Sequence, residues 1–118
     1  MRKIIVSEFI TVNGLMSDPG STMNWVKDTF NDEMLREISN QQSRVDTLLL
    51  GRLTYQFMMQ YWTHASPATE DEKMIRYMHN TSKIVFSKTL QHVQWNNSIL
   101  AKEINKEDLQ RWLEKSKT

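Results

Sequence analysis

The sequence predicts an α/β fold with a mainly parallel sheet flanked by helices. Short apolar runs alternate along the chain with segments that have apolar residues at helical spacing. Of the 118 residues, 39% are hydrophobic and 25% are charged, which is ordinary for one globular domain. Because strands and helices alternate, parallel strands covered by helices are favoured over an antiparallel sheet.

The first half of the chain predicts a strand, a loop and a helix. Residues 3–10 are nearly continuously apolar, as in a central strand buried on both faces. The loop that follows contains Asn13-Gly14 and Asp18-Pro19-Gly20, which are dipeptides and tripeptides typical of turns. Asn31 is then placed to cap a helix that ends near Arg44.

The second half repeats the alternation. A strand over Thr47–Leu50 enters a helix, Arg52–Tyr61, through Gly51. The remaining elements are a helix from a capping box at Thr69–Glu72 to about Asn80, strands at Lys83–Ser87 and Ser98–Lys102, and a helix capped by Asn105 with Leu109, Trp112 and Leu113 facing inward.

Composition excludes several classes of function. The formal net charge is +1 and no long run of like charge occurs, which argues against nucleic-acid binding. The chain has no cysteine, so disulfides, thiolate metal sites and thiol catalysis are excluded. His64, His79 and His92 lack metal-ligand spacing, and we expect no metal. Since no apolar run reaches membrane-spanning length, we expect a cytoplasmic protein without a membrane partner.

The turn at Gly51 is the first candidate site. A strand that feeds a helix through a glycine presents free backbone amides, which suit a phosphate. Arg52 can bind a phosphate with two donors of its guanidinium group, and the hydroxyl of Thr54 can add another hydrogen bond. The alternative is that Gly51 only turns the chain, Arg52 is a solvated charge and Thr54 caps the helix.

Ser87 and Lys88 form the second candidate site. They follow the predicted strand at Ile84, and in a parallel sheet that strand end lies at the same edge as Gly51. A hydroxyl and an ammonium group there would suit a second phosphate. The alternative is an ordinary polar loop at a strand end.

Four segments together resemble the dihydrofolate reductase-like superfamily. The resemblance is closest to its branch related to the reductase domain of the bacterial riboflavin-pathway bifunctional deaminase-reductase, and it covers nearly the whole chain. The segments are Arg2–Val6 leading into Thr11–Gly14, then Leu48–Tyr55, Tyr61-Trp62 and Lys83–Leu90.

This resemblance implies a three-layer fold and an NADPH-dependent reductase that acts on a pteridine- or pyrimidine-like substrate. Carried over, Gly51, Arg52 and Thr54 bind the pyrophosphate, Ser87 and Lys88 bind the adenosine 2′-phosphate, and the loop with Asn13 and Gly14 flanks the nicotinamide. The cofactor supplies the hydride, and the protein supplies position and a proton source.

The sequence departs from the family at one polar position. The riboflavin branch has an aspartate where this chain has Asn13, which can orient a ligand but cannot protonate it. Glu8, Asp28 and Asp32 are carboxylates near the expected cleft, although each suits a surface or helix-start charge better. No catalytic residue is therefore predicted.

The other departure concerns the C-terminal part of the family fold, a further strand and a second glycine-rich turn, which we expect this chain to lack. Residues 1–118 then form a single, incomplete domain. Unpaired sheet edges favour association with another chain, so we expect a homo-oligomer, with a dimer as the first expectation, or a shortened form of a longer parent. The alternative function is a non-catalytic oligomer that keeps the fold, with or without nucleotide binding.

Overall fold

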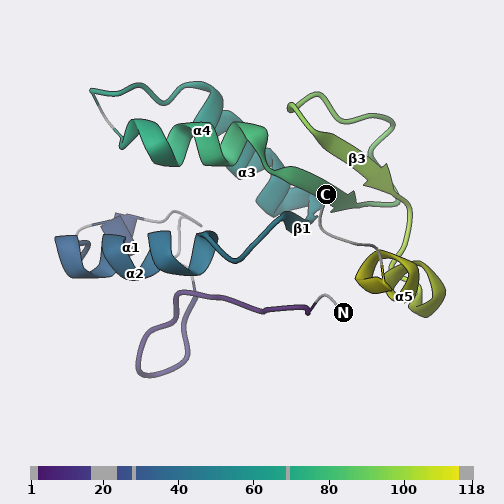
Figure 1. The fold of residues 1–118 in the computed structure, drawn as a ribbon, viewed down its shortest axis with the longest axis horizontal. Coiled ribbons are helices and arrows are strands. Elements are labelled where there is room, and N and C mark those ends of the chain that lie inside the picture. The colour runs from purple at the N-terminus through teal and green to yellow at the C-terminus, as the bar shows by residue number, and fades with distance from the viewer. Residues whose placement is uncertain (1–2, 17–23, 28, 69, 115–118) are drawn as a thin grey trace. The chain divides into compact units, whose positions relative to one another are not determined.

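A computed structural model of the chain describes residues 3–16, 24–27, 29–68 and 70–114 (Figure 1). The chain forms two compact units. The smaller unit comprises residues 3–44, and the larger contains the described residues from Val45 onward. None of the described helices is long and apolar enough to cross a membrane.

The larger unit is a small parallel sheet flanked by helices. Its three strands lie in the order β1-β2-β3, and both neighbouring pairs are parallel. This arrangement confirms the predicted α/β class and the parallel sheet. The elements in chain order are β1 (Thr47–Gly51), α3 (Arg52–Thr63), α4 (Glu72–Asn80), β2 (Ser82–Phe86), β3 (Ser98–Ala101) and α5 (Lys106–Glu114).

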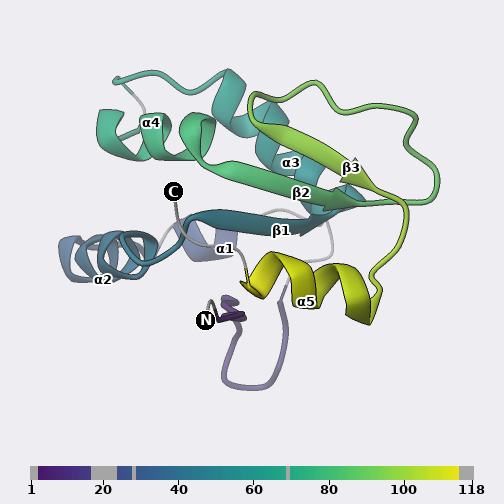
Figure 2. The ribbon, with the colours of Figure 1, turned by 45° about the vertical axis from the view of Figure 1, so that its right-hand side comes forward.

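Alternation along the strands assigns side chains to the two faces of this sheet. Leu50 pairs with Val85, and these residues lie on the face that α3 and α4 cover. Figure 2 shows α5 on the other side of the strands. There the ring of Phe86 lies 6.0 Å from the ring of Trp112 on α5, so the helix contacts the second face through an aromatic pair.

The hydrophobic core lies between the sheet and the helices α3 and α4. Val85 is fully buried in the central strand, because β2 has a neighbouring strand on each side. The buried members of this core are Leu50, Tyr55, Met78, Val85 and Trp95, with Leu48, Met58, Met59, Trp62, Tyr77, Leu90 and Val93 packed around them.

Side-chain caps define where the helices begin. The side chain of Asn105 accepts a hydrogen bond from the amide of Asp108 at 2.8 Å, which confirms the predicted cap of α5. The predicted capping box at the start of α4 is wrong, because Asp71 is the N-cap and its carboxylate accepts from the amide of Lys73 at 3.0 Å. Thr69 lies outside the described residues.

The smaller unit contains two helices, α1 (Asn24–Lys27) and α2 (Asp32–Gln42). Asn31 caps α2 as predicted, since its side chain accepts from the amide of Met34 at 2.9 Å. The rings of Phe9 and Phe30 contact edge to face within this unit.

The predicted central strand at residues 3–10 is wrong for the described structure. The segment does not form a strand, and its apolar side chains are exposed, with Val6 at 85%. Apolar and β-branched residues favour an extended chain, but a strand also needs a neighbour for its backbone hydrogen bonds. The described sheet consists of three strands, and this segment is not one of them.

The hydroxyl group of Tyr55 ties α3 to the long connection between β2 and β3. It accepts hydrogen bonds from the amides of Gln94 at 2.9 Å and Trp95 at 3.3 Å, and it donates to the sulfur of Met59 at 3.3 Å. Tyr55 is 3% exposed. A phenol group therefore satisfies two backbone donors in an apolar setting, where unpaired donors are costly.

Lys83 lies in the first half of β2 with only 1% of its surface exposed. Its ammonium group donates to the carbonyl oxygens of Thr81 and Asn96 at 2.9 Å each, and to that of His79 at 3.3 Å. It also lies 4.1 Å from the centre of the Trp95 ring, a cation–π distance. The charge is thus held by carbonyl dipoles and a ring face, which join the end of α4 to the chain before β3.

We predict that Tyr55→Phe lowers the free energy of unfolding by about 1–3 kcal/mol, because the amides of Gln94 and Trp95 lose their acceptor in an apolar setting. Urea unfolding of the two proteins measures the difference, and circular dichroism checks that the variant keeps its secondary structure. Equal stability would show that water replaces the hydroxyl group.

We also predict that stability rises with pH through Lys83. Burial lowers the pKa of this amine from 10.5 to about 8. Between these two values the unfolded chain binds more protons than the folded one, so raising the pH favours folding. Burial raises the pKa of Tyr77 above 10.0, which gives the opposite slope above that pH.

The measurement is urea unfolding of the protein and of Lys83→Met, from about pH 7.5 to about pH 9.5. The variant has no amine at this position, so its stability does not depend on the ionisation of Lys83. We expect the difference in stability, protein minus variant, to become more positive as the pH rises. Parallel pH curves would contradict the expected titration.

Candidate functional site

The carboxyl ends of the three strands meet at one edge of the sheet (Figure 2). Gly51 pairs with Phe86, and Phe86 pairs with Ala101, so the three strands end at the same level. This confirms that the Gly51 turn and the Ser87 loop share an edge. We call the segments that follow the strands, namely Gly51–Thr54, Ser87–Leu90 and Lys102, the carboxyl edge.

Gly51 is both the end of β1 and the N-cap of α3. Its φ of −80° and ψ of 172° are extended values that any residue adopts, and no side chain caps the helix here. A Cβ atom built on Gly51 would meet nothing within 4 Å. The backbone therefore does not require glycine, and glycine leaves open space in front of the first-turn amides.

Arg52 and Thr54 lie in the first turn of α3 with exposed side chains. Arg52 donates one hydrogen bond, from Nη1 to the side-chain oxygen of Gln56 at 3.2 Å. A guanidinium group has five N–H donors, so this contact orients the group and leaves donors for a ligand. Since Gly51 is the N-cap, the alternative role of Thr54 as the cap is excluded.

Ser87 is 8% exposed, and its hydroxyl group shapes the turn that follows β2. The oxygen accepts hydrogen bonds from the amides of Leu90 at 3.1 Å and Thr89 at 3.2 Å. Its contact with the hydroxyl of Thr89 is 3.3 Å. The turn leaves Lys88 exposed, so in this structure Ser87 positions the loop and Lys88 is the accessible charge.

Lys102 is a residue at the carboxyl edge that the sequence interpretation missed. It directly follows β3, and its ammonium group donates to the carbonyl oxygen of Leu90 at 3.3 Å. It therefore contacts the end of the Ser87 turn. The register argument that placed Ser87 at this edge would have placed Lys102 there too, had it been applied to the third strand.

Asn13 and Gly14 lie in a turn of the smaller unit. The amide of Gly14 donates to the carbonyl of Thr11 at 3.0 Å, and the φ of +91° at Gly14 is one that glycine adopts readily. The predicted turn is thus confirmed, while its role beside a nicotinamide stays a prediction. Glu8 and Asp32 are exposed in the same unit, and Asp28 lies outside the described residues.

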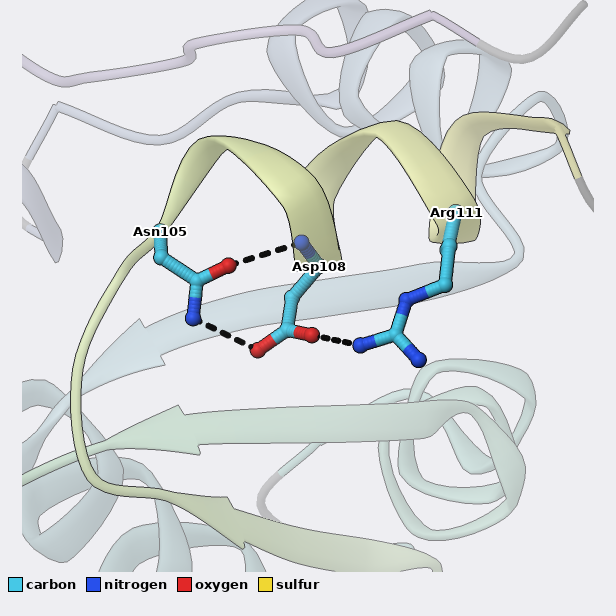
Figure 3. Close-up of polar contacts among 3 residues, drawn as sticks. All are labelled: Asn105, Asp108 and Arg111. Atoms are coloured by element: carbon cyan, nitrogen blue, oxygen red, sulfur yellow. Dashed lines mark hydrogen bonds and ion pairs between the residues drawn. The ribbon is translucent and has the colours of Figure 1, made fainter.

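A cavity of about 480 Å³ lies between β3 and the start of α5. Its polar rim includes a network in which the side-chain amide of Asn105 donates to Asp108 at 2.8 Å and Asp108 pairs with Arg111 (Figure 3). The opposite charges of Asp108 and Arg111 cancel, and the network organises the first turn of α5. The cavity is lined by Ile99, Leu100, Ala101, Lys102, Glu103, Asn105, Asp108, Arg111 and Trp112.

Trp62, His79 and His64 have structural contacts. Trp62 packs on the core, and Nδ1 of His79 accepts a hydrogen bond from the indole of Trp95 at 3.0 Å. Nδ1 of His64 lies 2.7 Å from the carbonyl of Gln60. In the described part of the chain, no three or more His, Cys, Asp or Glu side chains gather in a way that could hold a metal ion.

No protein-family model matches the chain, and no curated protein is significantly similar to it. Functional assignment therefore depends on the chemistry of the carboxyl edge itself. That chemistry combines an uncapped helix start with three exposed cations, Arg52, Lys88 and Lys102. Both features attract phosphate groups.

We predict that Gly51→Ala separates folding from binding. The backbone angles suit alanine and its Cβ has free space, which favours the variant, whereas alanine is a poorer N-cap than glycine. These effects oppose one another, so the free energy of unfolding should change by no more than about 1 kcal/mol in either direction. The methyl group would occupy the space in front of the α3 amides, so affinity for the ligand expected from the resemblance, NADPH, should fall. Urea unfolding and calorimetric titration measure the two effects, and unaltered affinity would place the phosphate elsewhere.

Proposed function

We propose that the protein is an NADPH-dependent reductase of the dihydrofolate reductase-like superfamily that acts on a pteridine- or pyrimidine-like substrate. The observation that carries this proposal is the carboxyl edge. An uncapped helix start and three exposed cations follow three parallel strands that end at one level. In open α/β sheets, nucleotides bind at this edge.

The two ends of such a cofactor have matching groups. A diphosphate placed before α3 would accept hydrogen bonds from the first-turn amides and from Arg52, while the Thr54 hydroxyl adds a donor. Because Gly51 has no side chain, the diphosphate can approach these amides closely. Lys88 then offers a second positive charge from the neighbouring strand end.

The cofactor supplies the chemistry of the reaction, which is transfer of a hydride to a ring imine or a sugar carbonyl. The protein's part is to hold the reacting rings together, exclude water and deliver a proton. Among the described residues of the carboxyl edge there is no carboxylic acid, so no proton donor is assigned.

The second candidate function is a non-catalytic homo-oligomer that keeps the nucleotide edge, with a dimer as the expected form. The observation in its favour is incomplete cover of the second sheet face, where Leu49 is 41% and Ile99 is 56% exposed. Parallel sheets normally have both faces covered. Association would also suit the reductase, so turnover of NADPH is what separates the two functions.

We predict that the protein oxidises NADPH when supplied with a panel of pterin and pyrimidine substrates, seen as loss of near-ultraviolet absorbance. Arg52→Gln should weaken NADPH binding at least about tenfold, because a hydrogen bond to a charged group contributes about 1.5–3 kcal/mol. Arg76→Gln is the control, since it removes the same charge from the exposed face of α4.

Binding of NADPH without turnover on any substrate would favour the non-catalytic oligomer. If Arg52→Gln and Arg76→Gln weaken binding equally, the effect is one of net charge and the assignment of Arg52 is wrong. Absence of NADPH binding would contradict the reductase and the nucleotide-binding form of the oligomer alike.

A further inference from the structure

We propose that the cavity between β3 and α5 is a binding site for a free α-amino acid with an apolar side chain. The cavity lies on the second face of the sheet, which α5 flanks (Figure 2), and the proposed reductase assigns no ligand to it. Its volume is about 480 Å³, and pockets for small molecules usually have volumes of about 300–1,000 Å³.

Apolar side chains from the strand and the helix form the floor of this cavity. Ile99 and Ala101 are two residues apart on β3, so they lie on the same face of the sheet, and Trp112 lines the cavity from α5. Ile99 is 56% exposed, so much of this floor is open to a ligand. A ligand with an apolar side chain would remove this surface from water, which favours binding.

Arg111 supplies a positive charge at the rim of the cavity. One terminal nitrogen of its guanidinium group pairs with Asp108, and the other has no marked contact (Figure 3). A guanidinium group has five N–H donors, so donors remain for a second carboxylate. Asn105 also donates to Asp108, at 2.8 Å, which holds the carboxylate that Arg111 contacts. The guanidinium group is therefore oriented before a ligand binds, which favours affinity.

Glu103 supplies a negative charge at the same cavity. Its side chain is exposed, and among the described residues its carboxylate makes no hydrogen bond and no ion pair. Glu103 and Arg111 thus line one cavity without pairing with each other. Two opposite charges in this arrangement suit a ligand that carries both an ammonium group and a carboxylate.

The charges of the rim sum to zero. Two cationic and two anionic side chains line the cavity, namely Lys102, Arg111, Glu103 and Asp108. A ligand of one sign would leave a charge of the opposite sign without a partner beside an apolar floor, which is unfavourable. An amino acid carries both charges near neutral pH and no net charge. The charge balance and the apolar floor together favour an amino acid over a phosphate or a polyamine.

The alternative is that these charges only organise the start of α5. In that case Arg111 stabilises the helix through Asp108, Glu103 is a solvated charge, and neither side chain affects a ligand. The two alternatives differ for compounds that share an aromatic ring and differ in charge. Phenylalanine has both charges, phenethylamine has only the ammonium group, and 3-phenylpropionate has only the carboxylate.

The experiment is calorimetric titration of these three compounds into the protein, Arg111→Gln and Glu103→Gln. The protein should bind phenylalanine at least about tenfold more tightly than either analogue, because each analogue lacks one charged hydrogen-bonding group. Arg111→Gln should lose the preference for phenylalanine over phenethylamine, since the carboxylate has lost its partner. Glu103→Gln should lose the preference for phenylalanine over 3-phenylpropionate. Each variant should keep the other preference.

Two substitutions elsewhere control for the loss of a charge. Arg76→Gln matches Arg111→Gln, because Arg76 also pairs with an acid on its own helix, Glu72. Glu37→Gln matches Glu103→Gln, since it removes an exposed carboxylate from the smaller unit. Neither control should change the preferences. Urea unfolding identifies loss of folding, and Glu103→Gln carries the test if Arg111→Gln is unstable, because the Glu103 carboxylate has no partner to lose.

Absence of phenylalanine binding overturns the inference, and so does equal binding of the three compounds. Preferences that persist in both variants overturn it as well. If a second copy of the chain covers Ile99 instead, native mass spectrometry should show a dimer that does not bind phenylalanine, which also contradicts the inference. NADPH turnover is a separate result, because binding of an amino acid between β3 and α5 does not depend on the carboxyl edge.

Discussion

The carboxyl edge depends on the burial of one ammonium group at the opposite end of the sheet. Lys83 begins the buried part of β2, and its side chain gathers carbonyl oxygens from the end of α4 and from the chain before β3. Its own amide donates to the carbonyl of Asn97 at 2.8 Å. These contacts fix where β3 starts relative to β2. Since strands rise by a constant length per residue, the same contacts also determine where both strands end.

Tyr55 provides the corresponding constraint from the other side of the core. The segment that turns at Gly51 belongs both to the carboxyl edge and to the core. Gly51–Thr54 are exposed at the edge, and Tyr55, the next residue, is buried in the core. The Tyr55 hydroxyl holds the amides of Gln94 and Trp95, and Trp95 contacts Lys83 in turn. One connected set of polar contacts thus joins the start of α3 to the loop that positions β3.

Local patterns in the sequence were sufficient for the parallel sheet and for most helices of the larger unit. The strand, glycine and helix around Gly51 were predictable because apolar runs, glycine and helical spacing are properties of neighbouring residues. The role of Lys83 was not, because its acceptors come from residues near 80 and 96 and no local pattern reports their convergence. The prediction of a strand at residues 3–10 was wrong for the same reason, since strand pairing depends on a partner that the segment's own composition does not specify.

The candidate site was predictable only as far as register reasoning was applied. Gly51 and Ser87 were placed together because parallel strands end at a common edge, and the same rule extends to Lys102.

The register rule does not predict which hydrogen bonds each polar side chain at this edge makes. The oxygen of the Ser87 hydroxyl accepts from two amides and so shapes the loop, while the predicted contact of its own O–H donor with a phosphate stays a prediction. The charged side chains with free donors are the groups that can bind a phosphate, and at this edge those are Arg52, Lys88 and Lys102. The exposed carboxylate of the neighbouring Glu103 would lower the net field that a phosphate met there, so the proposed recognition would depend on close contact with these donors more than on long-range attraction.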